Sequence, residues 1–131
     1  MLTTRELSID KITLHPRAGI VAMVASVNDV PIRLTEERWR HILEYHSELA
    51  KHLDKVLLTI AMPDTVFRSP RDVKENLAAV KKFTELVQDK LAEYLAVHYR
   101  ELSDKDGFIL TVFPISAERL RKRYGLWRRL K

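Results

Sequence analysis

The chain has 131 residues, enough for one domain with a modest core, and we expect a single domain over residues 1–131 in which residues 1–11 are loosely held. Hydrophobic residues make up 46% and charged residues 31%, a globular rather than a disordered composition. The absence of cysteine excludes disulfides and cysteine-ligated zinc or iron–sulfur centres. The longest apolar run, residues 19–25, is too short to span a bilayer and lies too far inside the chain for a signal peptide. We therefore expect a cytoplasmic protein with no membrane partner.

The positive charge is concentrated in residues 119–131, called the basic segment here. The formal net charge of the chain is +5, and the basic segment contains seven Lys and Arg residues and no acid. Such a cluster is typical of a nucleic-acid contact, because cations neutralise phosphates while Tyr124 and Trp127 can stack on bases. It predicts binding through Arg119, Arg121, Lys122, Arg123, Arg128 and Arg129. The alternative is a solvated tail that improves solubility or contacts an acidic partner.

Two extended runs precede the first predicted helix. Residues 20–27 and 30–34 are rich in β-forming residues and flank Asn28 and Asp29, a pair typical of turns. This pattern predicts an N-terminal β-hairpin. Pro31 cannot donate a ladder hydrogen bond, which favours an edge position for the second strand.

Two helices are predicted next. Thr35 suits an N-cap, and the apolar spacing after it is helical, with one face formed by Trp39, Ile42, Leu43 and His46. Ser47 can cap a second helix that Pro63 ends, and its apolar stripe is Leu49, Leu53, Val56, Leu57 and Ile60. Residues 65–68 then read as a short strand.

The local signals in residues 73–102 conflict. Apolar residues recur there at near-helical spacing, whereas residues 94–99 also alternate as a strand would. A turn precedes residues 108–113, an apolar run that is strongly strand-like. Because such a strand needs a ladder partner, we predict that residues 92–101 pair with residues 107–113 as an antiparallel hairpin.

Several short motifs occur in an order that resembles a known family. They are residues 32–39 (IRLTEERW) with His41 and Ile42 after them, 46–49 (HSEL), 62–69 (MPDTVFRS), 93–101 (EYLAVHYRE) and 106–111 (DGFILT). From about Ile32 to Trp127 the chain resembles phage- and mobile-element-associated nucleases with the barnase–EndoU–colicin–RelE-like fold. The resemblance implies an α+β fold in which two helices are followed by a four-stranded antiparallel sheet, with residues 78–83 as its second strand.

The resemblance also implies a hydrolase that cleaves RNA without a metal or cofactor. In that chemistry the 2′-hydroxyl of the substrate attacks the phosphate, and the protein supplies a general base, a general acid and cations. The predicted polar sheet face and the helix beside it offer the candidate catalytic residues His41, Arg68, Lys82, His98 and Thr111, of which Arg68 matches an arginine of the family. Structural alternatives are a solvated surface cation for Arg68 and a hydrogen bond within the sheet for Thr111. His41 and His46 lack the spacing of a helical zinc pair, so no metal site is expected.

The main functional hypothesis is a metal-independent endoribonuclease of the toxin-like or phage-defence type. The alternative is a non-catalytic module of the same fold that binds RNA or docks a protein partner, such as an antitoxin or inhibitor. Both would use the basic segment, but only the enzyme needs a base, an acid and phosphate-binding cations gathered in one place. A helical DNA-binding protein would need residues 73–102 to be helical, and the chain lacks a helix-turn-helix pattern.

Overall fold

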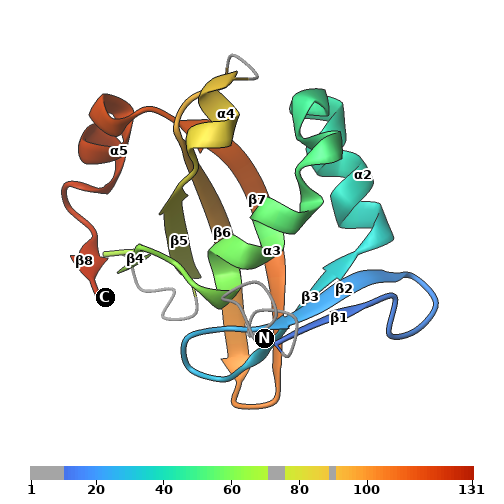
Figure 1. The fold of residues 1–131 in the computed structure, drawn as a ribbon. Helices are drawn as coiled ribbons and strands as arrows, with labels where there is room; N and C mark the ends of the chain where they lie inside the picture. Colours follow the sequence, from blue (N-terminus) through green and yellow to red (C-terminus); the bar gives the residue numbers. More distant parts are fainter. Residues whose placement is uncertain (1–10, 71–75, 89–90) are drawn as a thin grey trace, which may run out of the picture.

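The computed structural model describes residues 11–70, 76–88 and 91–131, which form one eight-stranded sheet flanked by helices (Figure 1). The strand order is β1-β2-β3-β7-β6-β5-β4-β8. Neighbouring strands are antiparallel, except that β3 and β7 are parallel. The strands are β1 (Ile12–Leu14), β2 (Ile20–Ala25), β3 (Pro31–Thr35), β4 (Thr65–Arg68), β5 (Asn76–Lys82), β6 (Tyr94–Ser103), β7 (Asp106–Ile115) and β8 (Arg128–Arg129).

The described ranges contain four α-helices and one 3-10 helix: α2 (Glu36–Tyr45), η1 (Ser47–Lys51), α3 (Leu53–Ala61), α4 (Thr84–Gln88) and α5 (Ala117–Tyr124). As predicted, Thr35 caps α2, because its Oγ1 accepts a hydrogen bond from the Arg38 amide at 3.1 Å. Glutamates occupy the first turn of α2, where the positive end of the helix dipole favours them. No helix in these ranges is both long enough and apolar enough to cross a membrane.

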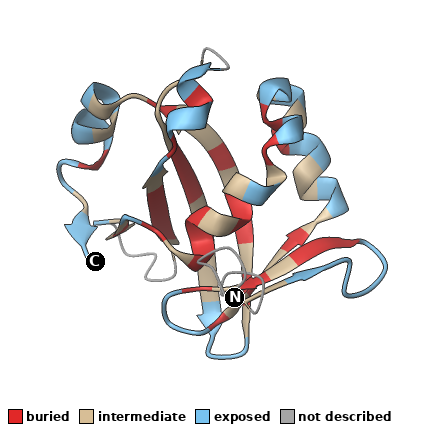
Figure 2. Ribbon diagram, viewed as in Figure 1, coloured by how far each residue is buried: buried red, intermediate tan, exposed pale blue. Residues whose placement is uncertain are grey.

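The two faces of the sheet carry separate cores, and Figure 2 shows the buried residues along its central strands. On the first face, called the helix face, α2 and α3 pack against the sheet, and the buried residues there include Ile42, Val56, Ile60, Leu95 and Val97. On the opposite face, called the α5 face, a smaller buried cluster consists of Ala78, Val80, Ala96, Ile115 and Tyr124. Because successive side chains of a strand point to opposite faces, β5 and β6 are apolar on both sides. The α5 face thus has an apolar area on which the basic segment docks.

The predicted α+β class is correct, but the predicted four-stranded antiparallel sheet is wrong. The N-terminal hairpin and the later strands form a single mixed sheet. They join where β3 pairs in parallel with β7, with Ile32 opposite Gly107 and Arg33 opposite Phe108. A Cβ on Gly107 would collide with the Arg100 carbonyl oxygen and with Ile32 Cδ1, so the missing side chain lets these strands approach. The alternation of apolar residues within one strand does not indicate which distant strand it pairs with, so the pairing of β3 with β7 could not be predicted from it.

Three local predictions also change. Pro31 lies in an interior strand, where it is tolerated as the first residue of β3. The second helix, predicted to start at Ser47, is divided into η1 and α3 on either side of His52. The basic segment adds α5 and the edge strand β8, so the helices exceed the two that were predicted. The loosely held end predicted for residues 1–11 lies, apart from Lys11, outside the described residues.

The hairpin that was predicted against the helical spacing is confirmed. β6 and β7 pair antiparallel over most of their length. The register shifts next to His98 and leaves Leu110 as an extra residue on β7, which is a β-bulge. Without the bulge, Phe108 and Phe113 would point to opposite faces, because they are an odd number of residues apart. With it, both rings lie on the α5 face.

Candidate nucleic-acid interface

The local sequence specifies α5 as a short basic helix. Ser116 Oγ accepts a hydrogen bond from the Arg119 amide at 3.2 Å, and Glu118 lies in the first turn. The last turn contains Arg121, Lys122 and Arg123, where the negative end of the helix dipole favours cations. Three of the four cations of α5 therefore lie at the end of the helix where the dipole favours positive charge, and Arg119 lies near its start.

Aromatic packing holds α5 against the sheet. The Tyr124 ring stacks on Phe67 of β4 with centroids 5.0 Å apart, and Trp127 meets Tyr124 edge-on at 4.9 Å. The Tyr124 hydroxyl lies 2.7 Å from Nε2 of His98 on β6. Burial raises the pKa of Tyr124 to about 12, so this hydroxyl stays protonated at neutral pH. These contacts connect α5 to β4 and β6.

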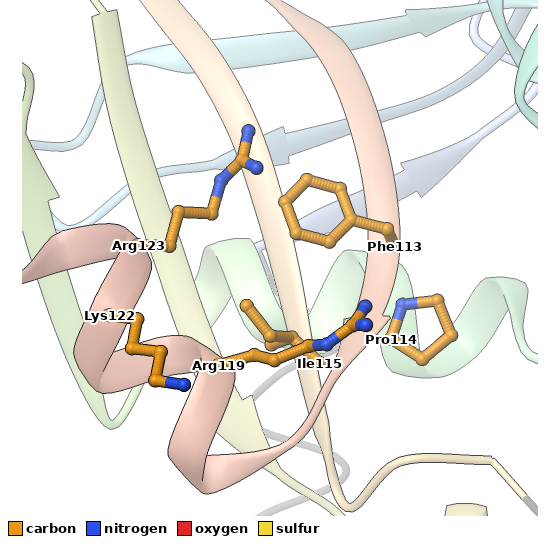
Figure 3. Close-up of a pocket in the computed structure, with 6 residues that line it drawn as sticks. All are labelled: Phe113, Pro114, Ile115, Arg119, Lys122 and Arg123. Atoms are coloured by element: carbon orange, nitrogen blue, oxygen red, sulfur yellow. The ribbon is translucent and has the colours of Figure 1, made fainter.

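An open pocket of about 400 Å³ lies between α5 and the end of β7, and we call it the α5 pocket. It is lined by Phe113, Pro114 and Ile115 of β7 and by Arg119, Lys122 and Arg123 of α5. The three cations lie on one side of the helix, since they are three and four residues apart. Figure 3 shows Arg119 and Arg123 extending from α5 toward β7. The Arg123 guanidinium lies 4.8 Å from the centroid of the Phe113 ring, a cation–π contact.

The charge of the α5 pocket is positive and only partly offset by acids. Lys122 Nζ lies 3.3 Å from a carboxylate oxygen of Glu118, and both side chains are exposed. Arg119 and Arg123 are also exposed, and neither forms an ion pair with another residue of the described ranges. An anion in the pocket meets two guanidinium groups, which match the geometry of a phosphate. The Phe113 ring beside them offers a stacking surface for a base.

His98 lies beneath the basic segment and is largely, though not fully, covered by it. Its ring packs against Phe113, Tyr124 and Trp127 at centroid distances of 5.3, 5.9 and 5.6 Å. Burial, reinforced by the nearby charge of Arg123, lowers the pKa of His98 to about 4. The imidazole is therefore neutral at pH 7 and cannot donate a proton as a general acid there.

Three of the five predicted catalytic residues lie on the α5 face. His98 and Thr111 are cross-strand partners on β6 and β7. Lys82 shares this face, but its partner on β6 is Tyr94, four residues or about 13 Å along the strand from His98. Lys82 is exposed, and its Nζ lies 3.7 Å from a carboxylate oxygen of Glu93. The structure thus brings His98 and Thr111 together and leaves Lys82 apart from them.

The other two predicted catalytic residues lie on the far side of the sheet. Arg68 is the cross-strand partner of Leu77, whose side chain belongs to the core of the helix face. His41 is exposed on α2, and its ring meets that of Tyr45 edge-on at 5.2 Å. Because α2 packs on the helix face, His41 does not approach His98 or Thr111. A converged set of base, acid and phosphate-binding cation is therefore not assembled from these five residues.

The six predicted nucleic-acid-binding cations divide between two elements. Arg119, Lys122 and Arg123 line the α5 pocket, whereas Arg121 is exposed on α5 outside it. Arg128 and Arg129 form β8 on the edge of β4. Phe113 was not among the predicted site residues, although an aromatic residue just before a basic helix is a signal that the sequence offers. The bulge at Leu110 decides on which face of the sheet the Phe113 side chain lies, and no pattern in the sequence indicated that bulge.

The described residues contain no group of three or more His, Asp or Glu side chains that could hold a metal ion. Comparison of the chain with protein-family models, with curated proteins and with solved structures finds no match. Function is therefore inferred from the geometry and charge of the α5 pocket.

Proposed function

We propose that this chain is an RNA-binding module that holds a phosphate and an adjacent base in the α5 pocket. The observation that carries the proposal is that Arg119, Arg123 and Phe113 line one pocket, with the Arg123 guanidinium 4.8 Å from the centroid of the Phe113 ring. Cations bind the charged backbone of a single strand, and an aromatic ring binds its bases. Cytoplasmic RNA is the class of partner that fits both requirements.

An acidic protein, such as an antitoxin or inhibitor, is the competing partner for this pocket. It would use the same cations but would have no need of the partly exposed Phe113 ring beside the Arg123 guanidinium. Half of the residues that line the α5 pocket are cations, whereas the centres of stable protein interfaces are depleted of charged side chains. The combination of ring and cations therefore favours RNA.

The proposal is tested by the salt dependence of RNA binding, followed by the fluorescence anisotropy of a labelled single-stranded RNA. The double variant Arg119→Gln, Arg123→Gln should weaken binding and flatten the slope of log K against log salt by about 1.4, because each phosphate that is no longer neutralised reduces the slope by roughly 0.7. Arg121→Gln is the matched control, because it removes one exposed cation from the same helix outside the pocket. Its slope should stay close to that of the wild type. An equal effect per charge in both variants would mean that the pocket has no special role.

Cleavage of the bound RNA is a second candidate, favoured by the position of His98 beside Thr111 and close to Arg123. A neutral imidazole can accept the 2′-hydroxyl proton while the 2′-oxygen displaces the 5′-oxygen from phosphorus, and the departing 5′-oxygen takes a proton from water to leave as an alcohol. The low pKa of His98 makes it a weak base, and Tyr124 and Trp127 cover it, so binding without cleavage is the stronger proposal. The test is incubation of RNA with the wild type and with His98→Ala, each with EDTA. Intact RNA supports the binding module, whereas fragments that depend on His98 would establish the nuclease.

A further inference from the structure

A second open pocket, of about 160 Å³, lies on the sheet near the start of β7. It is lined by Arg33, Thr35, Arg38, Phe108 and Ile109, and we call it the β3 pocket. The Phe108 ring lies between two cations, with the guanidinium carbons of Arg33 and Arg100 at 5.6 and 6.0 Å from its centroid. It therefore repeats the combination of aromatic ring and arginine found in the α5 pocket.

The rings of the two pockets lie on the same face of the same strand. Phe108 is opposite Arg100 and Phe113 is opposite Ala96, so four residues of β6, or about 13 Å, separate the two positions. Thr111 lies between them, and all three β7 side chains retain partial exposure. The tyrosine of α5 packs on β4 and β6, next to this row of side chains, and from α5 the Arg123 guanidinium lies over the Phe113 ring. Three partly exposed side chains thus lie along β7 from one pocket to the other.

The row formed by Phe108, Thr111 and Phe113 has positive side chains near both of its ends. Arg33 forms an ion pair with Asp106 and is largely neutralised by it. Arg100 donates from Nε to the Asn76 side-chain oxygen at 2.6 Å, a neutral partner that leaves its charge in place. Arg38 also lines the β3 pocket and forms no ion pair within the described ranges. Phosphates would therefore meet Arg38 and Arg100 at one end, and Arg119 and Arg123 at the other.

We infer that the ligand of this face is a single-stranded RNA segment that runs along β7, with separate bases stacked on Phe108 and Phe113. The inference rests on the RNA-binding function proposed above. At the rise of roughly 3.4 Å per nucleotide in a stacked strand, about 13 Å corresponds to three to five nucleotides. A duplex does not fit, because its internal bases are already stacked on one another and cannot lie on protein rings. Each base stacked on an aromatic ring adds affinity in a way that tolerates any sequence.

The experiment compares Phe108→Leu with the wild type for an eight-nucleotide single strand and for a duplex of the same length. Leucine retains an apolar side chain but lacks the ring, so affinity for the single strand should fall by about 5- to 150-fold. Duplex binding should not change, and neither should the salt slope of the single strand. Tyr45→Leu is the control, because it removes an exposed ring from α2 on the other side of the sheet. Arg38→Gln leaves the aromatic row intact and should flatten the single-strand slope by about 0.7.

Two outcomes would contradict the binding of a single strand along β7 without contradicting RNA binding in the α5 pocket. One is wild-type affinity for the single strand in Phe108→Leu together with an unchanged slope in Arg38→Gln. The other is duplex binding as tight as single-strand binding. If the wild type bound neither the single strand nor the duplex at low salt, the proposed RNA-binding function itself would be contradicted.

Discussion

The partly buried His98, which packs against Tyr124 of α5, should make the stability of the protein depend on pH. The pKa of His98 is about 4 in the folded chain, against about 6.5 in an unfolded one. Because the unfolded state binds the proton more readily, stability is full above pH 6.5 and is lost as pH falls toward 4. At pH 5 this difference amounts to about 2 kcal/mol. With an unfolding entropy of roughly 2.1 cal/mol/K per residue, the midpoint of thermal unfolding should fall by about 7 °C.

The assay is thermal and urea unfolding at pH 7 and pH 5 for the wild type and for His98→Gln. Glutamine does not titrate, and its amide can still hydrogen-bond the Tyr124 hydroxyl, so this variant should lose about 2 kcal/mol less than the wild type between the two pH values. The other four histidines are present in both proteins and cancel in the comparison. Equal losses in the two proteins would show that His98 is not shielded by the basic segment, and the described packing of α5 would then be wrong.

Two further predictions concern the sheet. Gly107→Ala should destabilise the protein by about 1–3 kcal/mol in urea unfolding, because the new methyl group meets the Arg100 carbonyl and Ile32 where β3 joins β7; an unchanged midpoint would argue against the parallel pairing. Tyr99→Phe should raise stability by about 1 kcal/mol, because the Tyr99 hydroxyl is buried and has no hydrogen-bond partner within the described part of the chain. A loss of stability in that variant would indicate a hydrogen bond to this hydroxyl.

The sequence by itself determined the elements whose signals are local. The cap at Thr35, the stripe of α2 and the turn before Phe108 are each contained in a few adjacent residues, and each predicted its element correctly. The β6–β7 hairpin was also predictable, although helical spacing competed with it, because an apolar strand after a tight turn requires a partner. The charge of the basic segment was equally plain.

Only the tertiary structure decided which of these elements meet. The parallel pairing of β3 with β7 depends on the space left by Gly107. The face of the sheet on which Phe113 lies depends on the bulge at Leu110. Both features depend on contacts between strands, and the spacing of apolar residues within one segment does not reveal such contacts. The same holds for the histidine assigned to catalysis: a polar residue at position 98 looked available, yet Tyr124 and Trp127 return from the C-terminal end to cover it. Desolvation by that cover, and not the residue type, sets the protonation of His98.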